Sequence, residues 1–154
     1  MEDIITRIKN DYPDLSFVEG SSFSWHAQKK HVSYKKTTQE QPNHNSWALL
    51  HELGHALLGH TDYTNDVELL QMEVSAWHKA KTLAKHYGPK IDDDYIEDCL
   101  DTYRDWLHLR STCPVCFARS LQSTTSVYRC YNCQATWQVS RSRLCRPYRL
   151  QKAK

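Results

Sequence analysis

Two closely spaced pairs of cysteines constrain the fold of this 154-residue chain more than any other feature. The pairs are Cys113-Pro-Val-Cys116 and Cys130-Tyr-Asn-Cys133, and 13 residues separate them. Two thiolates from each pair can complete a tetrahedral four-cysteine site at ~2.3 Å, which leaves no position open for a substrate. Few large aliphatic side chains surround these cysteines, so metal binding must supply folding energy that a small core cannot. We therefore predict a structural zinc ion in a zinc ribbon that covers residues 109–140.

The distribution of charge divides the chain at residue 108. Residues 1–108 contain all 18 acidic residues, whereas residues 109–154 contain nine basic residues and no acidic residue. The division predicts a first domain over 1–108, the ribbon over 109–140, and a basic tail without regular structure over 141–154. Basic residues interspersed with aromatic residues favour DNA or RNA as a partner. The alternatives are an acidic protein partner, a solvated tail, or docking on the chain's own acidic domain.

The sequence His51-Glu52-Leu53-Gly54-His55 has the HExxH pattern of zinc hydrolases. It lies in a predicted helix over about 45–59, whose apolar residues recur at helical spacing. Residues four apart lie on one face of a helix, so His51 and His55 can bind one zinc ion. Glu52 lies beside the first ligand, where it can act as a general base toward a water molecule. The pattern predicts a catalytic zinc site that hydrolyses amide bonds.

A hydrolytic zinc site needs a third protein ligand and one open position. His60 is the nearest candidate, but on a continuing helix it would point about 180° away from the first histidine, so it could bind only if the chain turned at Gly59. Glu73 is the better candidate, because an antiparallel second helix over about 66–87 would return its carboxylate to the HExxH helix. Two other candidates on that helix are predicted to be solvated: Glu68 and His78.

Hydrophobic spacing predicts the remaining elements of an α+β fold. Helices are expected over about residues 2–11, 45–59, 66–87 and 92–109. Alternating apolar residues on either side of a polar centre predict an antiparallel β-hairpin over 22–36. Short β-prone pieces follow residue 109. Two cysteines outside the pairs are predicted not to be ligands: Cys99 and Cys145.

The HExxH run continues as Ala-Leu-Leu-Gly-His60, and Met72-Glu73-Val-Ser-Ala-Trp-His-Lys-Ala80 follows. Over about residues 15–87 the chain resembles the ImmA/IrrE metallopeptidases, which are small gluzincin-like proteases. The resemblance implies His51, His55 and Glu73 as zinc ligands and Glu52 as general base. It also implies that an exposed hairpin strand, comprising Val32, Ser33 and Tyr34, binds an extended substrate by β-addition. Family members typically cleave a repressor or another regulatory protein.

The leading interpretation is a zinc endopeptidase whose ribbon recruits a protein substrate or nucleic acid. The alternative is a nucleic-acid-binding zinc protein in which the HExxH site is only structural. The spacing of the third ligand does not fit the SprT-like proteases. The group that would stabilise the oxyanion is left open among three residues: Tyr34, Tyr63 and His78. No apolar run approaches the ~20 residues of a membrane span, and the acidic N-terminus is unlike a secretory signal, so we expect a cytoplasmic protein without membrane partners.

Overall fold

The structure, a computed structural model, describes residues 2–35, 42–88, 90–140 and 149–151. Contacts divide the chain into two compact units. The first comprises Met1–Asp62 and Gln71–Ile96, and the second comprises Tyr63–Leu70 and Glu97–Lys154. Two of the boundaries fall inside helices, so these helices contribute residues to both units. The division at residues 108 and 140 stays a prediction from charge.

A small mixed sheet forms one part of the first unit. Its strands are β1 (Ser16–Glu19), β2 (Ser24–His26) and β3 (His31–Tyr34). The antiparallel pair β2–β3 confirms the predicted hairpin, and the short 3-10 helix η1 (Ala27–Lys29) connects the two strands. Strand β1 was not predicted, and it pairs with β3 in parallel. The strand order is therefore β1-β3-β2, with β3 in the centre and β2 at an edge.

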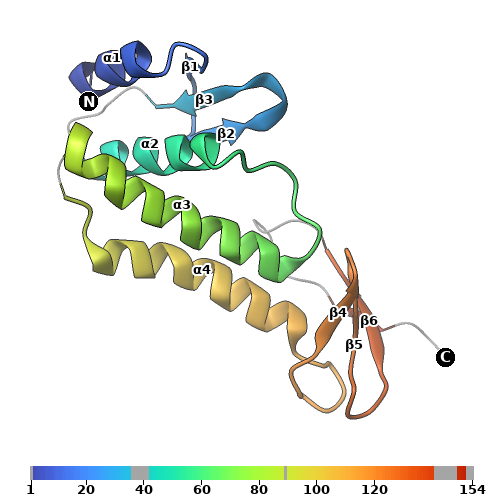
Figure 1. Ribbon diagram of the computed structural model, residues 1–154. Helices are drawn as coiled ribbons and strands as arrows, with labels where there is room; N and C mark the ends of the chain where they lie inside the picture. The colour runs from blue at the N-terminus through green and yellow to red at the C-terminus, as the bar shows by residue number, and fades with distance from the viewer. Residues whose placement is uncertain (1, 36–41, 89, 141–148, 152–154) are drawn as a thin grey trace. The chain divides into compact units, whose positions relative to one another are not determined.

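Four helices lie in the described part of the chain, and their positions agree with the predicted ones to within three residues. They are α1 (Glu2–Asp11), α2 (Pro42–Leu57), α3 (Asp66–Tyr87) and α4 (Asp93–Ser111). In the first unit, α2 packs against β2 and β3 and lies between the sheet and α3 (Figure 1). The apolar face of α2 is fully buried at Leu49, Leu50 and Leu53. Burial of each such side chain contributes roughly 1.5–3 kcal/mol, which holds the helix against its neighbours.

Helices α2 and α3 approach each other closely because Gly54 has no side chain. A Cβ atom at Gly54 would lie 2.7 Å from the carbonyl oxygen of Ala76 on α3. Ala76 is itself fully buried, and Trp77 beside it is 4% exposed. The glycine between the two histidines of the HExxH pattern therefore sets the spacing between the helices that carry the predicted ligands.

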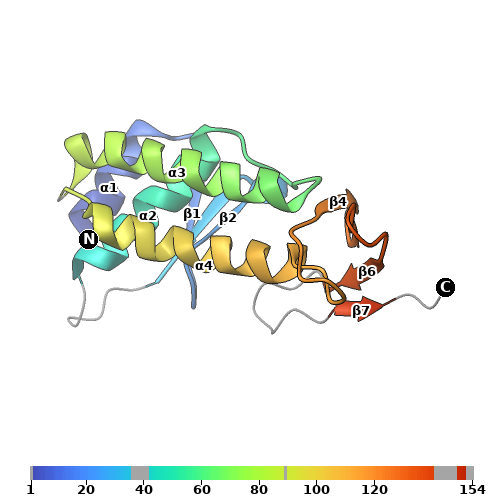
Figure 2. The same cartoon turned by 90° about the horizontal axis from the view of Figure 1, so that it is seen from below.

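The second unit contains a four-stranded antiparallel sheet. Its strands, in spatial order, are β4 (Leu121–Thr124), β5 (Val127–Arg129), β6 (Thr136–Val139) and β7 (Arg149–Gln151). Figure 2 shows β7 beside β6, where Trp137 faces Gln151 in the register. Three side chains form the core with the cysteines: Tyr128, Trp137 and Val139. The expectation that residues 141–154 lack regular structure is wrong for residues 149–151, because they add a strand to the sheet; the other residues of that segment lie outside the described ones.

A fully buried ion pair also belongs to the second unit. Asp66, in the first turn of α3, accepts hydrogen bonds from Arg110 Nε at 2.6 Å and Nη2 at 3.2 Å. The hydroxyl of Tyr128 donates to the same carboxylate at 2.5 Å, and burial together with this bond raises the pKa of Tyr128. Arg110 also donates to the carbonyl of Ser140 and lies over the ring of Trp106 at 4.4 Å. A buried charge pair needs such additional partners to offset its desolvation.

The observed architecture confirms the α+β class, with helices and two small sheets in the described residues and a four-cysteine cluster near the C-terminus. Within the described ranges, none of the helices has the length and apolar character that crossing a membrane requires.

Candidate metal centres

Three predicted ligands meet between α2 and α3. His51 and His55 lie one turn apart on α2, and Glu73 lies on α3; all three are at most 8% exposed. The Nε2 atoms of the two histidines are 3.1 Å apart. The carboxylate of Glu73 lies 3.2 Å from His51 Nε2 and 3.7 Å from His55 Nε2. The structure therefore brings together the residues that helical spacing predicted.

This arrangement fits a divalent metal ion. An ion held tetrahedrally at ~2.1 Å from each ligand atom would keep those atoms roughly 3.4 Å apart, and the observed separations lie on either side of this value. Burial places two imidazole lone pairs and a carboxylate against one another, which is costly unless a proton or a cation lies between them. Two histidines and one glutamate are also a known ligand set for catalytic zinc.

The alternative third ligands lie elsewhere. The carboxylate of Glu68 caps the start of α3 by accepting hydrogen bonds from the backbone N–H and the hydroxyl of Thr64, and these bonds lower its pKa. His78 is exposed, five residues beyond Glu73. Burial raises the pKa of Glu73, but hydrogen bonds and charge attraction from His51 and His55 outweigh burial and lower it to about 2. Glu73 is thus an ionised acceptor facing both histidines.

Glu52 lies beside this cluster, and its environment is suited to a proton acceptor. Burial raises the pKa of its carboxyl group, while the charges of His51 and His55 oppose that change. The backbone N–H of Trp25, on β2, donates a hydrogen bond to the carboxylate. A general base whose pKa lies closer to the working pH transfers protons more effectively.

His60 contacts a ligand and does not join the ligand cluster. Helix α2 ends at Leu57 and a turn follows, in which Gly59 has a φ of 67°. The N–H groups of Gly59 and His60 bond back to the carbonyls of Ala56 and His55. This pair of bonds is a Schellman motif, in which glycine adopts the left-handed conformation at no steric cost. The turn brings His60 Nδ1 to 2.9 Å from His55 Nδ1, on the side of the ring away from Glu73. Burial, together with repulsion from His55, lowers the pKa of His60.

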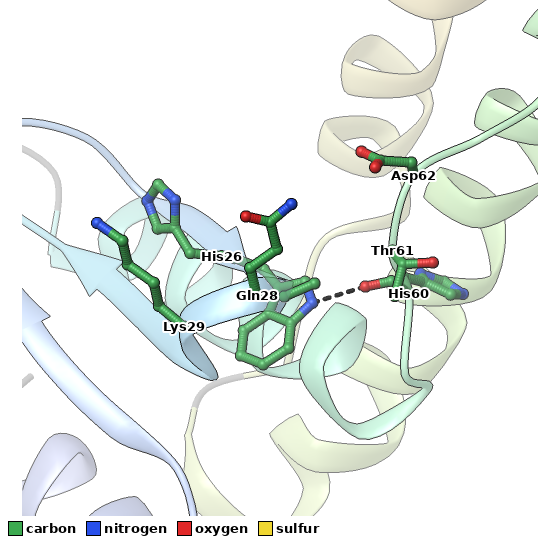
Figure 3. Close-up of a pocket in the computed structure, with 8 residues that line it drawn as sticks. His26, Gln28, Lys29, His60, Thr61 and Asp62 are labelled. Carbon is green, nitrogen blue, oxygen red and sulfur yellow. Dashed lines mark hydrogen bonds between the residues drawn. The ribbon is translucent and has the colours of Figure 1, made fainter.

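A cavity of about 410 Å³ lies between the edge strand and the chain that follows α2. His26, Gln28 and Lys29 line one side, and His60, Thr61 and Asp62 line the other (Figure 3). Trp25 also lines this cavity. The dashed line in Figure 3 marks the hydrogen bond from the Trp25 indole to the carbonyl oxygen of His60, at 2.8 Å. The cavity therefore adjoins residues that contact both Glu52 and His55.

The expected substrate-binding strand is wrong. Val32, Ser33 and Tyr34 belong to β3, which is hydrogen-bonded to β1 on one side and to β2 on the other. A strand with two neighbours has no free backbone edge for an added strand. In the described sheet β2 (Ser24–His26) is the edge strand that lies against α2.

The four paired cysteines form the second candidate metal centre. Their sulfur atoms lie within 4.8 Å of one another, with Cys113–Cys133 at 3.6 Å and Cys116–Cys130 at 3.5 Å. Thiolates bound at ~2.3 Å in a tetrahedron would lie roughly 3.8 Å apart, which agrees with these separations. A hydrogen bond from the backbone N–H of Cys133 is the main reason that the pKa of the Cys130 thiol falls to about 6. A lower pKa favours the thiolate, which is the form that binds a metal ion.

The two cysteine turns share one backbone pattern. The residue after each pair, Phe117 or Gln134, has a φ near 60°, and its N–H bonds to the carbonyl of the first cysteine of the pair. The described sulfur atoms therefore come from two equivalent turns, as the repeated spacing predicts. Cys99 lies on α4 outside this cluster, and Cys145 lies outside the described residues.

The structure does not select among the oxyanion candidates. The ring of Tyr34 lies under Lys9 of α1 at 5.8 Å, and His78 is exposed. The sequence reasoning missed Trp77, whose ring lies 4.1 Å from that of His51, and the role of Trp25. Helical spacing and strand alternation do not show which side chain each tryptophan touches, and only the fold does.

Comparison with models of protein families, with curated proteins and with solved structures finds no match to this chain. The likeness to the ImmA/IrrE metallopeptidases stays a prediction that depends on the motifs.

Proposed function

We propose that this protein is a zinc-dependent endopeptidase. The observation that carries the proposal is the convergence of His51, His55 and Glu73 on one buried point, with Glu52 next in the chain to the first ligand. Three protein ligands leave one coordination position for the reaction, as in hydrolytic zinc sites. Zinc bound there would supply Lewis acidity toward water and toward the scissile carbonyl.

The chain's own residues would then perform the proton transfers and hold the substrate. Glu52 accepts a proton from the attacking water and can return it to the leaving amine. The N–H of Trp25 orients the Glu52 carboxylate before the reaction. The 410 Å³ cavity beside the edge strand β2 offers space for a substrate side chain. An edge strand with a cavity beside it suits an extended, unstructured peptide segment, and the resemblance to the ImmA/IrrE metallopeptidases implies a regulatory protein as its source.

Substitution of Glu52 tests the proposal. Glu52→Gln preserves the size of the side chain and removes the base, so zinc content and unfolding midpoint should persist while peptide hydrolysis falls at least ~10²-fold. Hydrolysis is measured by mass spectrometry on a peptide library from a cell lysate. Glu19→Gln, at an exposed position at the end of β1, is the matched control and should cleave like the wild type. Equal cleavage by Glu52→Gln would refute the mechanism.

We further propose that the ribbon recruits nucleic acid. Phe117 and Tyr131 are 74% and 69% exposed, and they follow Cys116 and Cys130, whose sulfur atoms are 3.5 Å apart. Exposed aromatic rings next to basic residues can stack on unpaired bases. Affinity for single-stranded DNA or RNA should therefore fall steeply as salt rises from about 50 to about 200 mM. Replacement of Arg141, Arg143 and Arg146 by glutamine, which leaves β7 in place, should flatten this dependence.

The salt experiment also separates the rival interpretations. Nucleic-acid binding by a chain that never hydrolyses a peptide would favour the non-catalytic zinc protein. No binding at low salt would leave an acidic protein partner or docking on the chain's own acidic residues. The same three arginine substitutions should leave cleavage of a short peptide unchanged, because the candidate catalytic residues lie in the other unit.

A further inference from the structure

His60 lies outside the cluster of candidate ligands, but its imidazole is hydrogen-bonded to the ring of one of them, His55. Its Nδ1 atom lies 2.9 Å from His55 Nδ1. Its Nε2 atom lies 3.3 Å from the hydroxyl of Ser75 on α3. That hydroxyl in turn donates to the carbonyl oxygen of Met72 at 2.9 Å. The four groups form a continuous path from a ligand on α2 to the residue that precedes Glu73.

The direction of each hydrogen bond in this path follows from metal ligation. A neutral imidazole has one N–H and one acceptor nitrogen. His55 Nε2 faces His51 and Glu73, so ligation through Nε2 leaves the proton of His55 on Nδ1. His60 Nδ1 must then accept, which leaves the proton of His60 on Nε2. This proton is donated to Ser75 Oγ, whose own hydrogen goes to the Met72 carbonyl.

His60 is held in place independently of His55. The left-handed Gly59 turns the chain back, and the Trp25 indole donates to the carbonyl of His60 at 2.8 Å. Because the backbone of His60 is fixed in this way, its side chain loses little further entropy when it holds the ring of His55 in one orientation.

The other histidine ligand is held differently. Nδ1 of His51 is buried and has no hydrogen-bond partner among the described residues. Its ring instead lies on that of Trp77, with the centroids 4.1 Å apart and the planes 30° apart. The two candidate ligands on α2 are therefore unequal: among the described residues, only His55 has a hydrogen-bond partner at Nδ1.

We propose that His60 is a positioning residue, which fixes the tautomer and ring orientation of His55 and links that ligand, through Ser75, to the backbone before Glu73. This inference rests on the metal site of the proposed function but does not depend on hydrolysis. Groups that bond to the far nitrogen of a ligating histidine typically change metal affinity by about 10- to 100-fold.

Metal affinity in three variants tests the assignment. His60→Leu removes the acceptor and should weaken zinc binding at the His51/His55/Glu73 site about 10- to 100-fold in competition with a chelator. His60→Asn should recover most of this loss, because its amide oxygen can take the place of Nδ1 as acceptor. Ser75→Ala should cause a smaller loss. The ribbon zinc of the same chain is an internal control and should be released equally in all variants.

Three results would overturn the inference. The first is equal zinc affinity in His60→Leu and the wild type. The second is an equal loss of affinity in His60→Leu and His60→Asn, because a merely structural role does not depend on the hydrogen-bond acceptor that asparagine restores. The third is a long-range ¹H–¹⁵N spectrum of the zinc-loaded protein that places the proton of His60 on Nδ1. A chain that fails to hydrolyse peptides but shows the expected affinity series would overturn the peptidase and support the role of His60.

Discussion

Replacement of Gly54 by alanine should separate the helices that carry the candidate ligands. The added Cβ would lie 2.7 Å from the Ala76 carbonyl, whereas ordinary contacts begin at 3.4 Å. The obstructing atom is backbone, so α2 or α3 must move by about 0.7 Å, the difference between these two distances. Glu73 lies one turn before Ala76 on α3, and a shift of this size exceeds the ~0.5 Å within which a metal site must be held.

Two opposing effects decide the stability of Gly54→Ala. Alanine in a helix interior is favoured over glycine by about 0.5–1 kcal/mol. Overpacking of a dense core costs about 1–3 kcal/mol. We therefore expect the free energy of unfolding of the metal-free protein to fall by about 1 kcal/mol, and zinc affinity at the His51/His55/Glu73 site to fall about tenfold or more.

Chemical denaturation in the presence of a chelator measures the first quantity, and chelator competition measures the second. Gly20→Ala is the control, because its Cβ would meet only Ser33 Cβ at 3.9 Å. The sign of the change in the free energy of unfolding, together with the change in zinc affinity, decides the test. A Gly54→Ala protein that is more stable than the wild type and binds zinc equally well would refute the argument that this glycine sets the helix spacing.

Three further predictions follow from the described contacts. Wild-type protein should contain about two zinc ions by elemental analysis, and Cys113→Ser should lose one of them and unfold its segment, as judged by limited proteolysis. Asp66→Asn should lower the free energy of unfolding by about 3–5 kcal/mol in urea, because it leaves the buried Arg110 without a counter-charge. The pKa of Glu73 in the metal-free protein is lowered from 4.5 to about 2, so its stabilising contribution is complete above pH 4.5 and is lost as the pH falls toward 2. Acid titration followed by circular dichroism should thus show a loss larger by up to about 3 kcal/mol in wild type than in Glu73→Gln, and parallel curves would contradict the assigned contacts.

Local periodicity explains which parts of the candidate sites could be predicted. His51 and His55 share a helix face because residues four apart always do, and each cysteine pair closes its own turn. Glu73 required only the further assumption that two consecutive helices pack antiparallel. Each of these constraints links residues that are close in the sequence, so it depends little on tertiary contacts.

Long-range pairing explains what could not be predicted. Strand β1 is short and mostly exposed, and its pairing with β3 has no turn signal because the two are parallel. Without β1, the strand containing Val32 could be mistaken for an edge. Asp66 and Arg110 are 44 residues apart, and no local pattern links them. For His60, the spacing indicated that a turn at Gly59 was needed, but not that the turn would lead to the far nitrogen of His55.

The buried Asp66–Arg110–Tyr128 cluster limits how the ribbon could have been acquired or could be transplanted. A gene fragment for residues 109–140 encodes Arg110 and Tyr128 but lacks the carboxylate that both of them bind. A fragment ending at residue 108 retains Asp66 and lacks both partners. We therefore expect the cysteine segment to fold less stably when it is transferred by itself. A transfer that keeps this cluster intact must include the start of α3, the end of α4 and β5.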